Sequence, residues 1–411
     1  MIRDFISSKN DKFGPLSSIT ILDTGTVTAA PWAGTLAGEF GAEIIKIEPP
    51  TGDISRFNPP FLKDDAGNST STYWAQDARN KISMTLDFTK PESKEIFARL
   101  IKISDIWLES SIPGTYSKKF GITDEWVMEI NPKIIIVHVS GFGQTGEPEY
   151  VSRASWDMIG QAFSCYCDLN GYDGQEPLRI GPVINDYITA IWALWSALAG
   201  YIHAQETGKG QVIDIAQYEV MFRMINSYVL DYLTLGATKT RCGNKTYVHP
   251  FSIYPTKDGY IAIAAGGASF SRFMDCIPTL KDKPYKTVVD QMKYGDDIAE
   301  NLKVWLKDFT TAEAEKILSD ANVPCSEIMN IQKASKHPHY LAREDFLEWD
   351  DPVGGKVKGY GIVPKFSETP GKVWRGAPRL GQDTVTILKY IGYSEEQIEN
   401  LLKSGIVSKK K

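Results

Sequence analysis

Short apolar runs with the length of β-strands alternate with helical patterns through the first part of this chain. The apolar segment 18–23 is followed by a helical pattern at 31–40, which has a proline near its first turn, and then by a second apolar run at 42–48. A strand, a helix and a strand in this order form a βαβ unit, in which the two strands are parallel. This order of elements predicts an α/β fold.

The same alternation continues along the chain. Further strand-like runs occupy 82–87, 105–109 and 133–139, and helical patterns occupy 91–103 and 123–130. The run 133–139 is apolar almost throughout, which is typical of a parallel strand that is buried on both faces. These segments together predict a doubly wound, Rossmann-like sheet with helices on its faces.

The length and a change of pattern predict more than one domain. A chain of 411 residues is longer than one ordinary core requires. Near residue 226 the pattern changes to strand-like alternation followed by short helices. We predict a large Rossmann-like domain over 1–225, a small α+β domain over 226–330, and a C-terminal part, 331–411, that returns to the large domain.

The composition argues against several classes of protein. A net charge of −6 and a pI near 5.6 disfavour nucleic acid as the main partner. Among the five cysteines the one close pair, Cys165 and Cys167, has no second pair to complete a zinc site, so we expect reduced thiols, no metal and a cytoplasmic protein. The first residues lack the apolar core of a signal peptide. The chain also has no serine-hydrolase elbow and no pair of histidines at zinc-enzyme spacing.

Asp186 is the candidate catalytic residue. It lies in the segment 179–188, where an uncharged stretch of membrane-span length, 187–204, begins. Polar residues such as Thr189 and His203 interrupt this stretch, so we expect a buried helix and no membrane span. An aspartate before a helix is most often an N-cap. The helix terminus also favours the ionised carboxylate, which suits a nucleophile, so the two roles do not exclude each other.

Two further patterns permit a functional and a structural interpretation. Residues 141–146 match the G-x-G-x-x-G pattern directly after a strand, which taken alone suggests dinucleotide binding. No tightly packed helix start follows, so a glycine-rich turn at the edge of a pocket is favoured over an NAD(P)-dependent oxidoreductase. The basic clusters 79–81 and 118–119 are either solvated charges or phosphate contacts beyond the ends of strands.

Several blocks spread along the chain resemble the class III CoA-transferases. These blocks are Gly41-Ala-Glu-Ile-Ile-Lys-Ile-Glu48, Asn80-Lys81, 131–144, Thr207-Gly-Lys-Gly-Gln211 and Trp374-Arg-Gly-Ala-Pro378. The segments 218–224 and 364–366 are most similar to the branch of carnitine/γ-butyrobetaine and bile-acid CoA-transferases. The resemblance implies a Rossmann-like large domain built from both chain ends, a small central domain, and a homodimer of two interlocked rings.

The resemblance also implies an activity. The carboxylate of Asp186 would attack an acyl-CoA, give a mixed anhydride and then an aspartyl-CoA thioester, and pass CoA to a free carboxylic acid. We expect a carnitine- or γ-butyrobetaine-like acceptor, with a bile acid or an (R)-2-hydroxy acid as the alternative. Aromatic side chains that could face an ammonium group are Trp156, Trp192, Tyr228, Tyr232 and Tyr247.

Residues that would bind the substrates also follow from the resemblance. CoA is expected as a co-substrate. Its expected contacts are the loop Val27, Thr28 and Ala29, the basic residues Lys81 and Lys119, and the residues Asn80 and Phe142. A lysine contact of the carnitine enzyme is expected to be lost or replaced, because Ile112 stands at that position. Trp156, Gly266 and Gly267 are expected in the substrate pocket. Trp156 stands where the related racemases have a catalytic histidine, which argues against a racemase.

Overall fold

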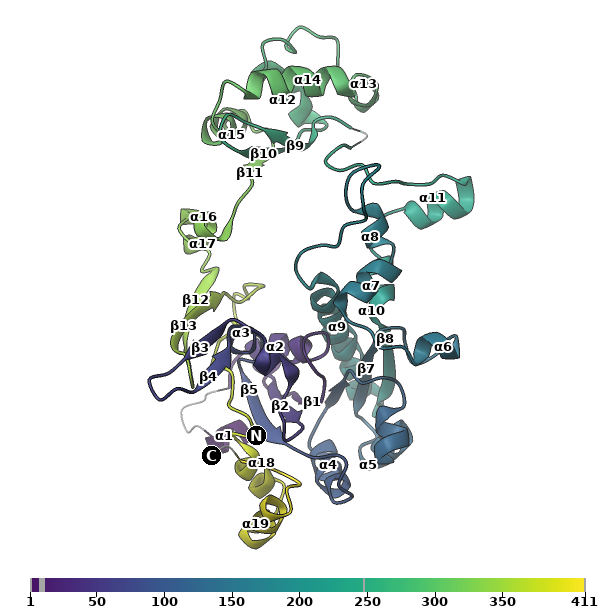
Figure 1. The fold of residues 1–411 in the computed structure, drawn as a ribbon, viewed down its shortest axis with the longest axis vertical. Helices are drawn as coiled ribbons and strands as arrows, with labels where there is room; N and C mark the ends of the chain where they lie inside the picture. Colours follow the sequence, from purple (N-terminus) through teal and green to yellow (C-terminus); the bar gives the residue numbers. More distant parts are fainter. Residues whose placement is uncertain (1, 7–11, 247, 410–411) are drawn as a thin grey trace. The chain divides into compact units, whose positions relative to one another are not determined.

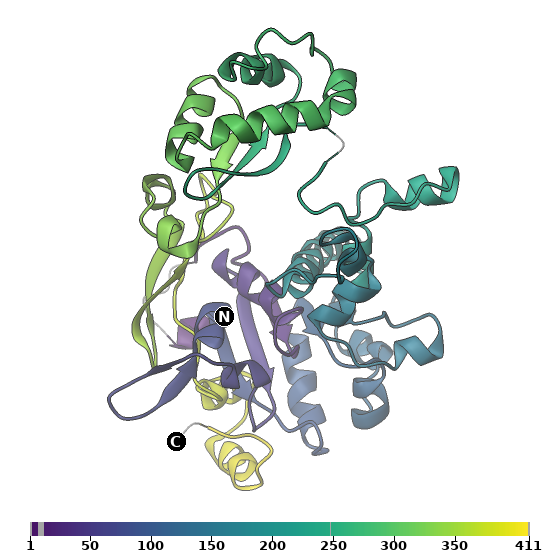
Figure 2. The ribbon, with the colours of Figure 1, turned by 45° about the horizontal axis from the view of Figure 1, so that its top comes forward.

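A six-stranded parallel sheet organises most of the structure, a computed structural model that describes residues 2–6, 12–246 and 248–409 (Figures 1 and 2). In spatial order the strands are β5 (Lys81–Thr85), β2 (Glu43–Glu48), β1 (Thr20–Asp23), β6 (Ile106–Glu109), β7 (Ile135–Ser140) and β8 (Gln211–Ala216). The order runs outwards from β1 in both directions, as in doubly wound nucleotide-binding sheets. The predicted mixed α/β fold with a parallel central sheet is confirmed.

Helices cover both faces of this sheet. One face carries α2 (Pro31–Glu39) and α9 (Ile184–Thr207), and the other carries α4 (Ser93–Lys102), α5 (Asp124–Ile130) and α18 (Thr384–Tyr390). Adjacent residues of one strand belong to the two different cores, since Ile135 packs with α9 while Ile136 packs with α4. Burial on both faces explains why these strands are continuous apolar runs in the sequence.

Helix α9 lies close to the sheet because small residues face it. Ala190, Ala193 and Ala197 are fully buried, and a side chain added at Gly200 would come within 3.2 Å of Ile135. This close packing accounts for the uncharged stretch in the sequence. The described part of the chain contains no helix with both the length and the apolar character that crossing a bilayer requires.

The block Thr207-Gly-Lys-Gly-Gln211 has a structural role at the end of α9. Gly208 has a φ of +76°, the left-handed conformation that ends a helix, and its amide donates to the carbonyl of Ala204. A Cβ atom at Gly210 would lie 2.0 Å from the carbonyl oxygen of Ile134. The two glycines therefore turn the chain directly from α9 into strand β8 beside β7.

The chain divides into two compact units. Unit 1 combines Met1–Cys167, Arg179–Ala237 and Arg343–Lys411, and unit 2 combines Asp168–Leu178 with Thr238–Ala342. These divisions fall about a dozen residues after the sequence-predicted domain boundaries at 225/226 and 330/331. The shift at the first boundary arises because the apolar helix α11 (Tyr228–Leu235) continues until Gly236, whose φ of +67° ends it.

Unit 2 has its own core. Its antiparallel sheet contains β11 (Cys325–Glu327), β10 (Tyr260–Ala264) and β9 (Phe251–Pro255). Its helices are α12 (Ala268–Cys276), α13 (Val288–Lys293), α14 (Gly295–Leu306), α15 (Thr311–Asp320), α16 (Ile331–Ala334) and α17 (Pro338–Ala342). Arg241 Nη1 donates to Asp168 Oδ1 at 3.0 Å, which shows why the distant segment 168–178 joins this unit.

The last part of the chain adds to unit 1. The amide of Ser83 in β5 donates to Asp383 Oδ2 at 2.9 Å, at the start of α18. The other elements of unit 1 are α1 (Ile2–Ile6), η1 (Ile54–Phe57), β3 (Phe61–Lys63), β4 (Ser69–Ser71), α3 (Thr72–Asp77), η2 (Thr115–Lys119), α6 (Pro148–Val151), α7 (Asp157–Phe163), α10 (Gln217–Phe222), β12 (Phe346–Asp351), β13 (Gly355–Tyr360) and α19 (Glu395–Lys403). Helix α8 (Tyr166–Leu169) lies where the chain passes into unit 2.

Candidate functional site

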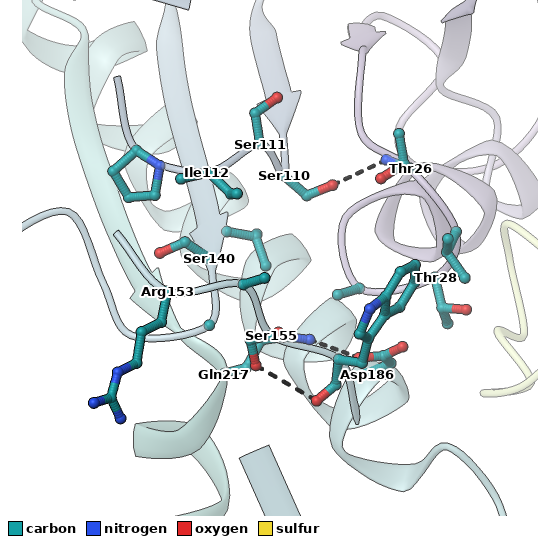
Figure 3. Close-up of a pocket in the computed structure, with 17 residues that line it drawn as sticks. Thr26, Thr28, Ser110, Ser111, Ile112, Ser140, Arg153, Ser155, Asp186 and Gln217 are labelled. Atoms are coloured by element: carbon teal, nitrogen blue, oxygen red, sulfur yellow. Dashed lines mark hydrogen bonds between the residues drawn. The ribbon is translucent and has the colours of Figure 1, made fainter. Parts of the chain in front are cut away.

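A cavity of about 220 Å³ opens at the carboxyl end of the parallel sheet in unit 1 (Figure 3). Ligands of doubly wound folds bind at this edge of the sheet. The lining comes from the loops after β1, β6 and β7, from the segment before α7, and from the starts of α9 and α10: residues 26–29, 110–113, 139–141, 153–156, Asp186 and Gln217. The fold thus assembles one site from segments spread over almost 200 positions of sequence.

Asp186 lies in this cavity. It is the third residue of α9, and its side chain is only 5 % exposed. Gln217 Nε2 donates a hydrogen bond to Asp186 Oδ1 at 2.6 Å, which Figure 3 shows as a dashed line. Within the described residues Asp186 Oδ2 accepts no hydrogen bond. One carboxylate oxygen is therefore held by Gln217, while the other is available to a ligand.

The N-cap of α9 is not supplied by Asp186. Val183 occupies the N-cap position, and Asp157 on α7 satisfies the first-turn amides from outside the helix. Asp157 Oδ1 accepts from the amides of Asn185 at 2.8 Å and Asp186 at 3.3 Å, while Gln161 Nε2 donates to Asp157 Oδ2 at 2.7 Å. The N-cap role that the sequence left open for Asp186 is thus filled by Asp157.

Helix α7 can act as this cap because it approaches α9 very closely. A Cβ atom at Gly160 would lie 1.9 Å from Asn185 Nδ2, so any larger residue would displace the Asn185 side chain. Asp157 and Gln217 were missed in the sequence because they lie 29 and 31 residues from Asp186. The spacing of Asp157 and Gln161 on one helical face gives no indication of which distant helix they contact.

Burial and a neighbouring charge change the acidity of Asp186. Burial is the main factor that raises the pKa of Asp186 to about 7, with a second contribution from the charge of Asp157. The hydrogen bond from Gln217 acts in the opposite direction and favours the ionised form. Near neutral pH this group is therefore partly a carboxylate with little hydration, which is the state that a nucleophile requires.

The loop after β1 is held in a strained conformation. Val27 has a φ of +62°, which is rare for a β-branched residue. Its amide donates to both oxygens of Asp53 at 3.3 and 3.2 Å, and the amide of Thr26 donates to Ser110 Oγ at 2.9 Å. Although burial acts to raise it, the ion pair with Lys46 and the hydrogen bonds from Ser55 hold the pKa of Asp53 below its ordinary value. An ionised Asp53 thus fixes the backbone at the cavity.

Asn80 and Lys81 were expected to contact CoA, and the structure places both within the protein interior. Both are buried and absent from the cavity lining. Asn80 Oδ1 accepts from the amide of Trp374 at 2.8 Å, which attaches the C-terminal segment to the sheet. Lys81 Nζ donates to Asp23 Oδ2 at 2.9 Å and to the carbonyl of Pro31 at 2.6 Å. These side chains support the sheet and the loop after β1, because their polar groups are already engaged by the protein.

The other predicted residues divide into two groups. Val27, Thr28, Ala29 and Trp156 line the cavity, and Ile112 also lines it at the position expected to lack a lysine. The remaining predicted residues, which are not in the lining, are Lys119, Phe142, Gly266 and Gly267. Lys119 is an exposed residue at the end of η2, and Phe142 packs against Phe163 with ring centroids 5.2 Å apart. Gly266 and Gly267 belong to unit 2, where they join β10 to α12.

The cavity contains a basic residue that the sequence analysis did not single out, and it lacks most of the aromatic residues that were considered for an ammonium group. Arg153 is the one basic side chain among the lining residues, and its guanidinium lies 4.1 Å from the ring centroid of Tyr150. Among the aromatic residues considered for an ammonium group, Trp192, Tyr228 and Tyr232 are not in the lining. Tyr247 lies outside the described residues.

The glycine pattern at 141–146 forms a turn. The pattern is followed by the short helix α6, which starts only at Pro148, and the amide of Gln144 donates to Asp214 Oδ2 at 2.8 Å. A Cβ atom at Gly141 would lie 2.1 Å from Ser155 Cβ, so this glycine lets two parts of the cavity wall meet. The geometry agrees with a pocket-edge turn, since no helix begins where a dinucleotide pyrophosphate would bind.

Comparisons with known proteins find relatives along nearly the whole chain. Residues 16–384 match the family model described as CoA-transferase family III. The chain is 40 % identical over 408 residues to the bile acid CoA-transferase BaiK of Clostridium scindens, which covers 97 % of this chain and 90 % of that protein. A CAIB/BAIF family protein from Brucella suis superimposes with a TM-score of 0.80 at 27 % identity, covering 92 % of this chain and all of that one. Rv3272 from Mycobacterium tuberculosis shares the fold, with a TM-score of 0.79 at 21 % identity over 91 % and 99 % of the two chains.

Proposed function

This chain belongs to CoA-transferase family III, and from this membership we propose that Asp186 is the nucleophile that carries CoA from an acyl-CoA to a free carboxylic acid. The observation that carries the assignment is the buried carboxylate of Asp186, which faces the cavity with one oxygen held and the other available. A carboxylate can form two kinds of activated acyl intermediate, so it suits a transfer between acids.

The proposed cycle begins with attack on the donor. Asp186 Oδ2 attacks the carbonyl carbon of the donor thioester, a C–O bond forms, the C–S bond breaks, and a mixed anhydride and CoA thiolate result. The thiolate then attacks Cγ of Asp186, which forms a C–S bond and releases the donor acid together with the oxygen that was Oδ2. The product of this half-reaction is an aspartyl-CoA thioester.

The second half-reaction reverses these steps with the acceptor. An acceptor carboxylate oxygen attacks Cγ of Asp186 and expels the thiolate, and the thiolate then attacks the acceptor carbonyl carbon. The new acyl-CoA leaves, and Asp186 keeps one oxygen of the acceptor. Each intermediate is an activated acyl group, so the free energy of the thioester is conserved if water is excluded. The burial of Asp186 supports this requirement.

Two kinds of groups support CoA binding at this cavity. The rigid loop 26–29 presents backbone to the ligand, and we propose that it contacts the pantetheine arm. We propose that Arg153 faces the phosphates, because a guanidinium binds phosphate through paired hydrogen bonds. Lys119 stays a predicted phosphate contact, since its side chain is exposed.

We propose a bile acid or a similarly large acid as the acceptor. The relative of 40 % identity is described as a bile acid CoA-transferase. A carnitine-like acid was expected from the sequence, but among the aromatic residues considered for its ammonium group that the structure describes, only Trp156 is in the cavity lining. A (R)-2-hydroxy acid is the remaining alternative.

Oxygen transfer tests the proposed function directly. The protein is incubated with an acyl-CoA and with cholate or γ-butyrobetaine labelled with ¹⁸O in the carboxyl group, and the peptide that contains Asp186 is weighed by mass spectrometry. We expect ¹⁸O on Asp186 and the CoA thioester of the accepted acid among the products. New thioester without label on Asp186 would show that another group carries the acyl transfer.

The rate of transfer should depend on pH through Asp186. Only the ionised carboxylate attacks, and burial raises the pKa of Asp186 to about 7, so kcat/KM should rise with pH and level off above this value. Well below it, kcat/KM should fall about tenfold for each pH unit. A pH–rate profile with saturating acceptor measures this dependence. A profile that is flat through neutral pH would contradict the assignment.

We propose a homodimer, in the interlocked form that the family resemblance implies. Large apolar side chains on α9 and α11 are exposed in the single chain, including Trp195 at 63 %, Leu233 at 76 % and Leu235 at 74 %. Exposed apolar surface of this kind is typical of a protein interface. Light scattering should give twice the chain mass at micromolar concentration. A monomer over the whole concentration range would refute the dimer.

A cytoplasmic location also remains a proposal. All five cysteines are free thiols in the structure, which suits a reducing compartment. Fractionation of the source cells, followed by detection of the chain in the cytoplasmic and membrane fractions, would test it.

A further inference from the structure

We propose that Gln217 is a catalytic residue that stabilises negative charge on Oδ1 of Asp186 each time Cγ of Asp186 is attacked. This inference rests on the proposed function and adds to it the group that assists two of its four chemical steps. Gln217 is the first residue of α10, is 6 % exposed, and lines the cavity with its amide nitrogen 2.6 Å from Asp186 Oδ1.

The fold brings this amide to the nucleophile through the edge of the sheet. Strand β8 pairs with β7 so that Ala216 lies beside Ser140, and the chain enters α10 immediately afterwards. Gln217 thus emerges at the carboxyl end of the sheet, where α9 also begins. Figure 3 shows the side chains of Gln217 and Asp186 pointing towards each other across this corner of the cavity.

The position of the hydrogen bond fixes the chemistry that it can assist. Oδ2 is the free oxygen, so Oδ2 attacks the donor and becomes the bridging oxygen of the anhydride, while Oδ1 becomes the carbonyl oxygen of Asp186. When the thiolate attacks Cγ, an electron pair moves onto Oδ1 before the Cγ–Oδ2 bond breaks. When the acceptor carboxylate attacks Cγ of the thioester, the charge again develops on Oδ1 before the Cγ–S bond breaks.

A carboxamide is well suited to this position. It is neutral, it donates through nitrogen at every pH of the reaction, and it neither competes as a nucleophile nor loses its proton. A preformed donor at the oxygen that gains charge typically contributes about 10²–10³-fold in kcat. In contrast, the charge that forms on the donor or acceptor carbonyl is not on Oδ1, so Gln217 does not assist those two steps directly.

Gln217 also favours ionisation of Asp186, and this second effect must be separated from the first. Loss of the hydrogen bond should raise the pKa of Asp186 and slow the initial attack at neutral pH. Higher pH should restore that attack. Higher pH should not restore the rates of the two steps at Cγ. In these steps the missing donor would stabilise the transition state, and a change of pH does not replace it.

The test is Gln217→Met, which keeps the length of the side chain and removes the donor. We expect kcat at pH about 9, where Asp186 is ionised, to stay about 10²–10³-fold below wild type. When the protein is mixed with cholyl-CoA alone and quenched with acid before the adducts equilibrate, the ratio of adducts should shift from the aspartyl-CoA thioester towards the mixed anhydride with the acyl group. Gln217→Glu, which has the same size and adds a charge that opposes an oxyanion, should lose at least as much activity.

A matched control is Gln161→Met, which removes a buried glutamine amide that contacts Asp157 and not Asp186. Its ratio of the two adducts should stay that of wild type. Recovery of kcat by Gln217→Met at high pH, or an unchanged ratio of adducts, would overturn the proposal. If wild type acquires neither the acyl nor the CoA mass, the proposed function fails instead, so the two failures are distinguishable.

Discussion

Replacing Asp186 by alanine is expected to reduce CoA transfer by roughly 10⁴-fold or more, because the variant lacks the group that is acylated in the proposed mechanism. The cavity should keep its ability to bind CoA. The loop 26–29 is fixed by Asp53 and Ser110, and neither contact involves Asp186. Initial rates with an acyl-CoA and an accepted acid measure the loss, and calorimetric titration with CoA measures the retained binding.

Asp186→Asn is the matched variant, since it keeps the size of the side chain and removes the charge. It should be as inactive as the alanine variant and should carry no ¹⁸O after incubation with labelled acceptor. Transfer at a rate close to wild type by either variant would remove Asp186 from the mechanism. Loss of CoA binding together with activity would point to a structural role.

The asparagine variant should also be more stable than wild type at alkaline pH. The folded protein raises the pKa of Asp186 from 3.8 to about 7, so the folded state binds the proton more tightly than the unfolded chain. The contribution of protonated Asp186 to the free energy of unfolding is fully present below the pKa of the unfolded chain. It is lost as pH rises through about 7, and the total loss is about 4 kcal/mol. At pH about 8 the variant should therefore have a larger free energy of unfolding than wild type, and at pH about 4 the two free energies should be equal.

The second large effect is expected at Lys81. Lys81→Met should lower the free energy of unfolding by about 3–5 kcal/mol, because it removes one partner of a buried ion pair. Lys81 is 1 % exposed and its Nζ lies 2.9 Å from Asp23 Oδ2. Asp23 would keep Lys46, at the longer distance of 3.4 Å, as its remaining partner. Urea unfolding of the purified variant measures this loss.

Lys119→Met is the control, because the side chain of Lys119 is exposed and its loss should leave unfolding unchanged. If Lys119 contacts a phosphate, the KM for acyl-CoA should rise. The opposite pattern, with a stable Lys81→Met variant and a raised KM for acyl-CoA, would support the direct CoA contact that the family resemblance implies for Lys81.

Local patterns in the sequence were sufficient to predict the parts of the structure that depend on neighbouring residues. Strand and helix periodicity predicted the parallel sheet, because buried parallel strands appear as continuous apolar runs. The start of the uncharged stretch indicated where Asp186 stands, since a charge at the end of an apolar helix is visible in the sequence itself. The loop 26–29 follows the first strand, so its place at the carboxyl end of the sheet also follows from the order of elements.

The parts that could not be predicted depend on contacts between distant segments. Lys81 looks like one of a basic cluster, and its burial becomes visible only when Asp23, 58 residues away, is placed beside it. Gln217 directly follows a strand in the sequence, and nothing local shows that its amide meets a carboxylate on another helix. The strain at Val27 is equally hidden, because it is maintained by Asp53 from a separate loop.

The external cap on α9 has a consequence for Asp186, which the proposed mechanism modifies and restores in every turnover. An N-cap aspartate that became an anhydride or a thioester would lose hydrogen-bonding strength towards the helix amides, and the first turn could fray as the reaction proceeds. Here Asp157 keeps its hydrogen bonds to the backbone of residues 185 and 186 whatever is attached to the neighbouring carboxyl group. The helix can therefore keep its first turn while Asp186 changes covalent state, and the reacting carbon returns to the same place for each new substrate.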